Sequence, residues 1–228
     1  MTDHNGLRNR LPMPLNAKLI NRLHKSLAAV DDHGTVGPRL SDDARRLWNR
    51  VQRFIGMSLV PSPGLDLEAL ELACSALQLP QRRPRTLAGG RPTRSTLRER
   101  SEESAELLIG IAVDDASVEL LDRTVRILHE MHERSPMLEE SKLLADAFNL
   151  GDFGLTGLLD LTLHTGRHGE GIMQLADGLE KRDQYGYWDS RLKDGFHFEA
   201  IRRIAQERLD HARAAAAILR GEMEDDKL

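Results

Sequence analysis

Apolar residues recur every three or four positions in most segments of this sequence, and leucine is the commonest of them. The clearest case is residues 41–55, where the spacing persists over about four helical turns. The apolar positions of that segment are Ala44, Leu47, Trp48, Val51, Phe54 and Ile55. The chain has 37 Leu against 16 Val and Ile together, and only 4% of its residues are aromatic, which favours helix over strand. We therefore expect an all-α protein.

Glycine, proline and capping residues divide the chain into about nine helical segments. The expected helices are residues 16–30 with Asn16 as N-cap, a helix opened by Ser41, a helix capped by Asp66, residues 95–112, a helix capped by Asp114, residues 136–149 and residues 196–220. Glycines at 151, 154 and 157 predict a tight turn or close packing. The expected organisation is a flexible N-terminus at 1–15, one helical domain at 16–220 and an acidic, frayed tail at 221–228.

The length of 228 residues fits one large or two small domains, and the sequence excludes several classes of protein. No stretch approaches the roughly 18 to 20 apolar residues of a membrane span, and the polar start lacks the apolar core of a signal peptide. We therefore expect a cytoplasmic protein without a membrane partner. Cys74 is the single cysteine, which excludes an internal disulfide and a thiolate metal cluster, and its helical position predicts burial.

One stretch concentrates positive charge in a chain whose net charge is −4. Residues 81–100 hold seven Arg and one Glu, and prolines and paired glycines predict a loop at 81–94. Guanidinium groups suit phosphate, but no aromatic residue lies between these arginines to stack a base, and the chain uses 26 Arg to 6 Lys throughout. Nucleic acid is therefore not an expected partner.

Short motifs of several enzyme classes are absent, among them the phosphate loop, the G-x-S-x-G elbow and H-E-x-x-H. Two histidine pairs have a loose metal-ligand spacing. His129 and His132 are three residues apart, and His164 and His168 are four apart. Neither spacing is specific, and solvent-facing histidines explain both pairs more simply.

Five of the nine aromatic residues lie within residues 185–198, mixed with charged side chains. They are Tyr185, Tyr187, Trp188, Phe196 and Phe198. Rings with polar tips suit a half-wet binding surface, and the candidate binding residues are Tyr185, Tyr187, Trp188 and Arg191. Burial of the rings against the last helix would produce the same clustering, so both interpretations stay open.

Residues 136–157 have the sequence PMLEESKLLADAFNLGDFGLTG, in which Asp146, Ala147, Leu150, Gly154 and Gly157 match the pattern D-A-D-x-L-D-x-x-G-x-x-G. This text resembles the HD superfamily of metal-dependent phosphohydrolases, most closely its small single-domain members. Phe148 and Gly151 replace the second and third aspartates of the family pattern. Near the C-terminus, Ile204, Ala205 and Arg208 are similar to the family's closing I-A-x-x-R. The resemblance implies a single HD-like helical bundle, here with an extra N-terminal helix.

The resemblance also implies a metal site made by an early His, a His-Asp doublet and a late Asp, and most of these residues are replaced here. Leu77 and Gln78 stand at the doublet, Asp43 stands where the first His is expected, and Asp146 alone keeps the family residue. Leucine has no lone pair to offer a metal. We therefore expect no catalytic residue, no bound metal and no other cofactor.

Two functions are compatible with this resemblance. The favoured one is a degenerate, non-catalytic HD-like protein that binds an unknown protein or a small phosphorylated ligand, either as a monomer or as a homo-oligomer. The alternative is an active phosphohydrolase for a nucleotide or another phosphoester, in which a divalent metal on relocated ligands activates water. Those ligands would come from Asp43, His129, His132, Asp146, His164 and His168.

Overall fold

The computed structural model describes residues 15–29, 37–60, 63–82, 95–112, 117–167 and 169–225, and these residues form helices and connections without a strand. The all-α prediction is confirmed. The α-helices are α1 Leu15–Ala28, α2 Gly37–Gly56, α3 Leu67–Ala76, α4 Leu97–Ala112, α5 Val118–Glu130, α6 Glu139–Asn149, α7 Gly154–Arg167, α8 Ile172–Gln184, α9 Tyr187–Asp194 and α10 Glu199–Asp225. Two short 3-10 helices, η1 Leu79–Arg82 and η2 Leu150–Asp152, complete the described elements.

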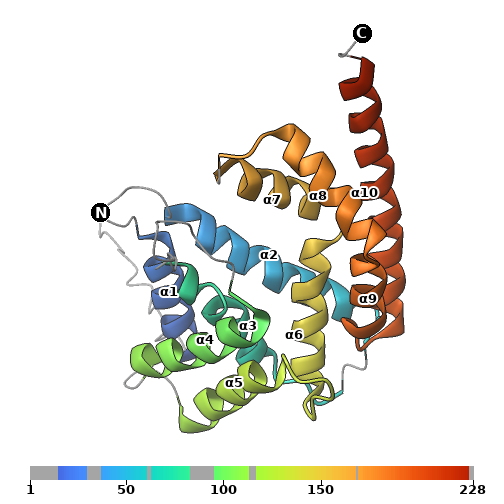
Figure 1. Cartoon of the computed structure of the whole chain (residues 1–228). Coiled ribbons are helices and arrows are strands. Elements are labelled where there is room, and N and C mark those ends of the chain that lie inside the picture. Colours follow the sequence, from blue (N-terminus) through green and yellow to red (C-terminus); the bar gives the residue numbers. More distant parts are fainter. Residues whose placement is uncertain are drawn as a thin grey trace, which may run out of the picture.

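The helices form a bundle around α6, which stands near its centre in Figure 1. Helices α1, α3, α4 and α5 lie on one side of α6, and α9 and the long α10 lie on the other, while α2 crosses α6 in this view and α7 and α8 form a hairpin beside the upper half of α10 (Figure 1). One hydrophobic cluster joins buried residues from α1 through α6 with residues of α9 and α10. Cys74 is fully buried in it, as predicted. Among the described helices, none has the length and apolar character to cross a membrane.

Side-chain caps fix the starts of three helices. Asp66 accepts a hydrogen bond from the Ala69 N–H at 3.0 Å, which confirms the predicted cap of α3. Ser117 caps α5, whereas the predicted cap Asp114 lies outside the described residues. Thr96 and Glu99 form a reciprocal capping box before α4, with the Thr96 N–H donating to Glu99 at 2.8 Å and the Glu99 N–H donating to Thr96 at 3.2 Å.

Several predicted helix ends are wrong by a few residues. Ser41 does not open α2, which begins at Gly37. The Ser41 side chain is buried and shares a 3.0 Å hydrogen bond with His24 of α1. Helix α1 begins at Leu15, so Asn16 lies inside it. Helix α6 begins at Glu139 rather than Pro136, and α10 spans Glu199–Asp225, so residues 221–225 are helical rather than a frayed tail.

Two buried carboxylates hold α6 in place. Glu140 accepts hydrogen bonds from the Asp66 N–H at 2.9 Å and from Arg123 at 2.7 Å, which connects α6 with the start of α3 and with α5. Glu130 accepts the N–H groups of Met137 and Leu138 at 2.9 and 2.8 Å, which fixes the connection from α5 to α6. Each carboxylate meets several donors, so its burial is compensated.

The turn between α6 and α7 is tight, as its glycines predict. Gly154 has a φ of +81°, in the left-handed region that favours glycine. A Cβ atom on Gly157 would lie 2.0 Å from the backbone oxygen of Asp152, closer than any real contact. Only glycine therefore fits at position 157 while η2 keeps this path.

Candidate functional site

Asp146 lies on α6 and is fully buried. Its two carboxylate oxygens accept the backbone N–H groups of His197 and Phe198 at 2.8 and 2.9 Å. These two residues come directly before α10, so Asp146 joins the centre of the bundle to the start of the last helix. Asp146 is therefore a buried, hydrogen-bonded carboxylate and not a surface residue.

The environment of Asp146 opposes its ionisation. Burial raises the pKa of Asp146 to about 7, although the N–H donors of His197 and Phe198 and the positive charge of Arg202 act in the opposite direction. The folded protein therefore holds the proton of this carboxyl group more tightly than the unfolded chain does. The contribution of Asp146 to stability is fully present below the ordinary pKa of 3.8 and is lost as the pH rises through about 7.

The Asp146→Ala variant should lose about 2 to 3 kcal/mol of unfolding free energy at pH 5, because two buried N–H groups lose their acceptor. The loss should be smaller at pH 8, where the wild-type carboxylate is ionised and costs more to bury. Urea denaturation at both pH values measures the two losses. Asp43→Ala is the matched control and should change stability little, because Asp43 is half-exposed and pairs with Arg39 and Arg46 on its own helix. An Asp146→Ala loss that is equal at both pH values would contradict the raised pKa.

The positions that resemble the His-Asp doublet contact an arginine. Arg100 of α4 donates to the Leu77 carbonyl oxygen and to Gln78 Oε1, at 2.7 Å in each case. Its guanidinium group also lies over the ring of Phe148, 5.0 Å from the ring centre. Phe148 stands where the family pattern has its second aspartate. Leu77, Gln78 and Phe148 therefore all contact Arg100, a cation of the protein itself.

Among the described residues, the other proposed ligands are not gathered around one point. Asp43 lies on α2, His129 is exposed on α5, and His132 shares a 3.0 Å hydrogen bond with Ser101 of α4. His164 lies on α7, and His168 lies outside the described residues. Across the described ranges, no three His, Cys, Asp or Glu side chains come close enough together to hold a metal ion. The arginine-rich loop at 81–94 is described only as far as Arg82.

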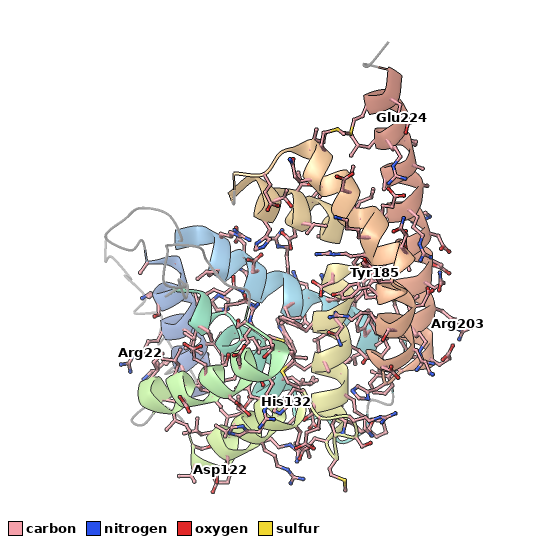
Figure 2. All side chains as sticks on the ribbon, in the orientation of Figure 1. Arg22, Asp122, His132, Tyr185, Arg203 and Glu224 are labelled. Carbon is pink, nitrogen blue, oxygen red and sulfur yellow. The ribbon has the colours of Figure 1, made fainter. Side chains whose placement is uncertain are left out.

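The four candidate binding residues have different environments. Trp188 is 9% exposed and packs edge-on against Phe153 with ring centres 5.4 Å apart. Tyr187 is 39% exposed, and Tyr185, at the turn between α8 and α9, is 82% exposed (Figure 2). Arg191 is half-buried and donates to Asp152 at 2.9 Å and to Asn149 at 3.2 Å. The aromatic cluster therefore contains a buried part around Trp188 and an accessible part at Tyr185 and Tyr187.

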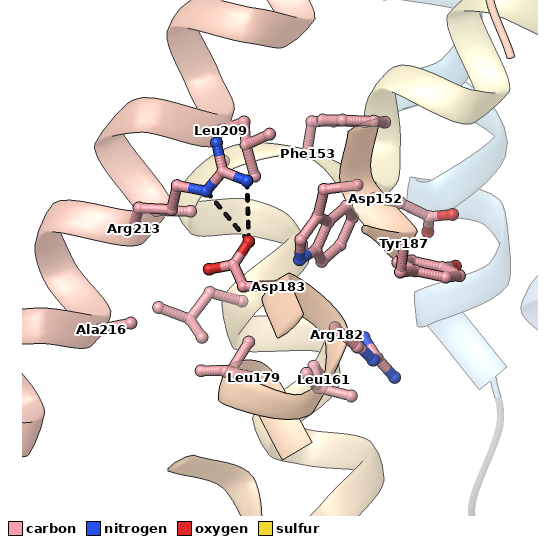
Figure 3. Close-up of a pocket in the computed structure, with 15 residues that line it drawn as sticks. Asp152, Phe153, Leu161, Leu179, Arg182, Asp183, Tyr187, Leu209, Arg213 and Ala216 are labelled. Carbon is pink, nitrogen blue, oxygen red and sulfur yellow. Dashed lines mark hydrogen bonds and ion pairs between the residues drawn. The ribbon is translucent and has the colours of Figure 1, made fainter. Parts of the chain in front are cut away.

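Tyr187 and Trp188 line a cleft between α7, α8, α9 and α10, which we call the aromatic cleft (Figure 3). Its cavity volume is about 50 Å³, room for a few water molecules. Phe153, Leu158, Leu161, Leu179, Leu209, Ala212 and Ala216 form most of its apolar wall.

Two arginines give the aromatic cleft its charge. Arg182 lies over the rings of Tyr187 and Trp188, 5.5 and 5.9 Å from their centres. Arg213 donates to Asp183 through two nitrogens at 2.8 and 3.0 Å, as the dashed lines in Figure 3 show. Because the Asp183 pair neutralises Arg213, Arg182 is the cation that a ligand in this cleft would meet first. Arg213 and the α7 wall were not predicted as site residues, because they lie outside the aromatic stretch at residues 185–198.

Comparison with known proteins gives a fold but no family. No protein-family model matches the chain, and no curated protein matches it. The solved structures that share the fold include Lin1889 from Listeria innocua and YpgQ from Bacillus subtilis. Lin1889 has a TM-score of 0.57 and 18% identity, over 92% of this chain and 96% of Lin1889. YpgQ has a TM-score of 0.57 and 18% identity, over 91% of this chain and 96% of YpgQ, and one YpgQ structure is a complex with ADP.

Proposed function

We propose that this chain is a non-catalytic, HD-like binding module whose ligand is a small phosphorylated molecule with an aromatic ring, such as a nucleotide. The observation that carries the proposal is the use of Asp146. Both of its oxygens accept backbone N–H groups inside the bundle, so the one retained family ligand supports α10 instead of facing a substrate. Gln78 and the Leu77 backbone are likewise used to bind Arg100.

The aromatic cleft is the proposed binding site. The Arg182 guanidinium now lies over one face of the Tyr187 ring, and a base can stack on that face once Arg182 moves toward the phosphate. This movement is needed because the present cavity is smaller than a base. The ADP complex of YpgQ, a protein of similar fold, supports a nucleotide as the first ligand to test.

Calorimetric titration with ADP tests the proposal. Wild-type protein should bind ADP without added metal, and Tyr187→Ala should weaken binding by about tenfold or more, because stacking of one base on one ring contributes about 1 to 3 kcal/mol. Tyr185→Ala is the matched control and should bind as wild type, because Tyr185 does not line the aromatic cleft. Equal losses in the two variants, or no binding by the wild type, would contradict the proposed site.

A hydrolysis assay distinguishes the proposed binding function from the alternative, an active phosphohydrolase. Incubation of the protein with ADP and with a generic phosphoester, in the presence of manganese or magnesium, should release no phosphate above a protein-free blank. Metal-dependent release that disappears in Asp146→Ala would instead support an active phosphohydrolase with Asp146 in a metal site. Elemental analysis of the purified protein provides a second measurement, because an active metal site predicts stoichiometric metal.

A further inference from the structure

Two arginines approach the turn between α6 and α7 from different helices. Arg50 of α2 donates to the Ala147 carbonyl oxygen at 2.5 Å, and its guanidinium lies against Gly151, where an added Cβ atom would be 3.2 Å from Nη1. Arg208 of α10 packs on Gly154, where an added Cβ atom would be 3.0 Å from Cβ of Arg208. Because glycine has no side chain, positions 151 and 154 leave room for the side chains of Arg50 and Arg208.

These arginines repel one another. Burial, followed by the charges of Arg208 and Arg46, lowers the pKa of Arg50 to about 10. Burial and the charge of Arg53 lower the pKa of Arg208. Arg50 still carries its proton at neutral pH. Like charges in a half-buried place are unfavourable unless an anion lies near them.

The neighbouring acidic groups compensate for these positive charges only in part. Asp152 is the carboxylate that favours the charged form of Arg50, but it is bound to Arg191. Asp43 is paired with Arg46. The Cys74 thiol is fully buried, which raises its pKa and keeps it neutral. Throughout the described part of the chain, no carboxylate forms an ion pair with Arg50 or Arg208.

Three other half-buried arginines each form an ion pair with a carboxylate. Arg123 is paired with Glu140, Arg191 with Asp152 and Arg213 with Asp183. Arg50 and Arg208 form no such pair within the described residues, and their side chains reach the same turn from two different helices. A ligand that carries more than one negative charge would compensate for both guanidinium groups.

We propose that Arg50 and Arg208, with the exposed Arg53 at the rim, form an oxyanion site for a phosphate or pyrophosphate group. The planar guanidinium group binds phosphate oxygens in pairs, and a phosphate dianion balances two arginines where a single carboxylate does not. The site adjoins the aromatic cleft, because Asp152 and Gly154 line the cleft, but Arg50, Arg53 and Arg208 are outside its wall. The inference therefore goes beyond the proposed function and can fail independently of it.

Calorimetric titration with inorganic pyrophosphate tests the site, with sodium chloride of equal ionic strength as the control for screening. Wild-type protein should bind pyrophosphate, and Arg208→Gln should weaken that binding by about tenfold or more. Glutamine keeps the Cβ and Cγ atoms that pack on Gly154. Arg203→Gln is the matched control, because Arg203 is exposed on the same helix and points away from the bundle in Figure 2. It removes the same charge and should leave the affinity unchanged.

The melting temperature without ligand gives a second measurement. Arg208→Gln should melt at or above the wild-type temperature, because it removes repulsion and no ion pair. Arg53→Gln should fold normally and lose affinity for pyrophosphate by a smaller factor than Arg208→Gln. No binding by the wild type, equal losses in Arg208→Gln and Arg203→Gln, or a much lower melting temperature for Arg208→Gln would each overturn the oxyanion site.

Titration of the same variants with ADP identifies the source of the phosphate. If Arg208→Gln and Tyr187→Ala both weaken ADP binding, the oxyanion site and the aromatic cleft hold one nucleotide. If Arg208→Gln weakens pyrophosphate binding but not ADP binding, the oxyanion site takes a free phosphate or pyrophosphate ion. If Tyr187→Ala weakens ADP binding and pyrophosphate does not bind to the wild type, the proposed function stands and the oxyanion site is wrong.

Discussion

The Gly157→Ala variant should lose about 3 kcal/mol or more of unfolding free energy. The added methyl group would lie 2.0 Å from the backbone oxygen of Asp152 and 2.4 Å from its carbonyl carbon, so the main chain itself must move. That movement is costly, because the Asp152 side chain is bound to Arg191 and the next residue, Phe153, is buried between the rings of Trp188 and Phe196. Urea denaturation followed by circular dichroism measures the loss.

Gly166→Ala in the same helix is the matched control. Nothing lies within 4 Å of a Cβ atom at position 166, so alanine there should stabilise α7 by about 0.5 to 1 kcal/mol through its better helix propensity. If Gly157→Ala were as stable as Gly166→Ala, this result would contradict the close approach of the Asp152 backbone in η2 to Gly157 in α7. The walls of the aromatic cleft near Phe153 would then be wrong as well.

Most helices were predictable from sequence because they bury apolar residues at a spacing of three or four positions, but no helix was predicted between residues 150 and 195, where α7, α8 and α9 lie. Their starts were less predictable, because a cap depends on what else its side chain can bind. Asp66 and Ser41 both have the residue type of an N-cap. The Ser41 hydroxyl, however, shares a hydrogen bond with His24 of the neighbouring helix α1, and α2 begins four residues earlier. The capping box of Thr96 and Glu99 matches the sequence pattern T-x-x-E, but it was not predicted.

The candidate sites were predictable only where their residues are close together in sequence. Tyr187 and Trp188 belong to one aromatic run, but the aromatic cleft also needs Leu158 of α7 and Ala212 of α10, which no local pattern connects to them. Arg50 and Arg208 are two of 26 arginines in the sequence. Their shared position beside the Gly151–Gly154 turn depends on how α2 and α10 pack, so it could not be inferred from spacing.

Trp188→Ala should lose about 3 to 5 kcal/mol of unfolding free energy, the range expected when a buried tryptophan is truncated to alanine. Trp188 is 9% exposed, and its ring meets Phe153 and Tyr187 edge-on with centres 5.4 and 5.0 Å apart. Its loss would leave a cavity where α9 packs against the η2 turn. Thermal and urea denaturation measure the effect.

Tyr185→Ala is the matched control, because Tyr185 lies three residues earlier in the same aromatic run and is 82% exposed. It should change the unfolding free energy by less than about 0.5 kcal/mol. Tyr187→Ala should fall between the two in stability, because Tyr187 is partly exposed and contacts Trp188. This order would show that Trp188 is packed in the wall of the aromatic cleft while Tyr187 is only partly packed. If Trp188→Ala and Tyr185→Ala instead melted together near the wild-type temperature, Trp188 would be a surface residue, and the packing of α9 that forms the aromatic cleft would be wrong.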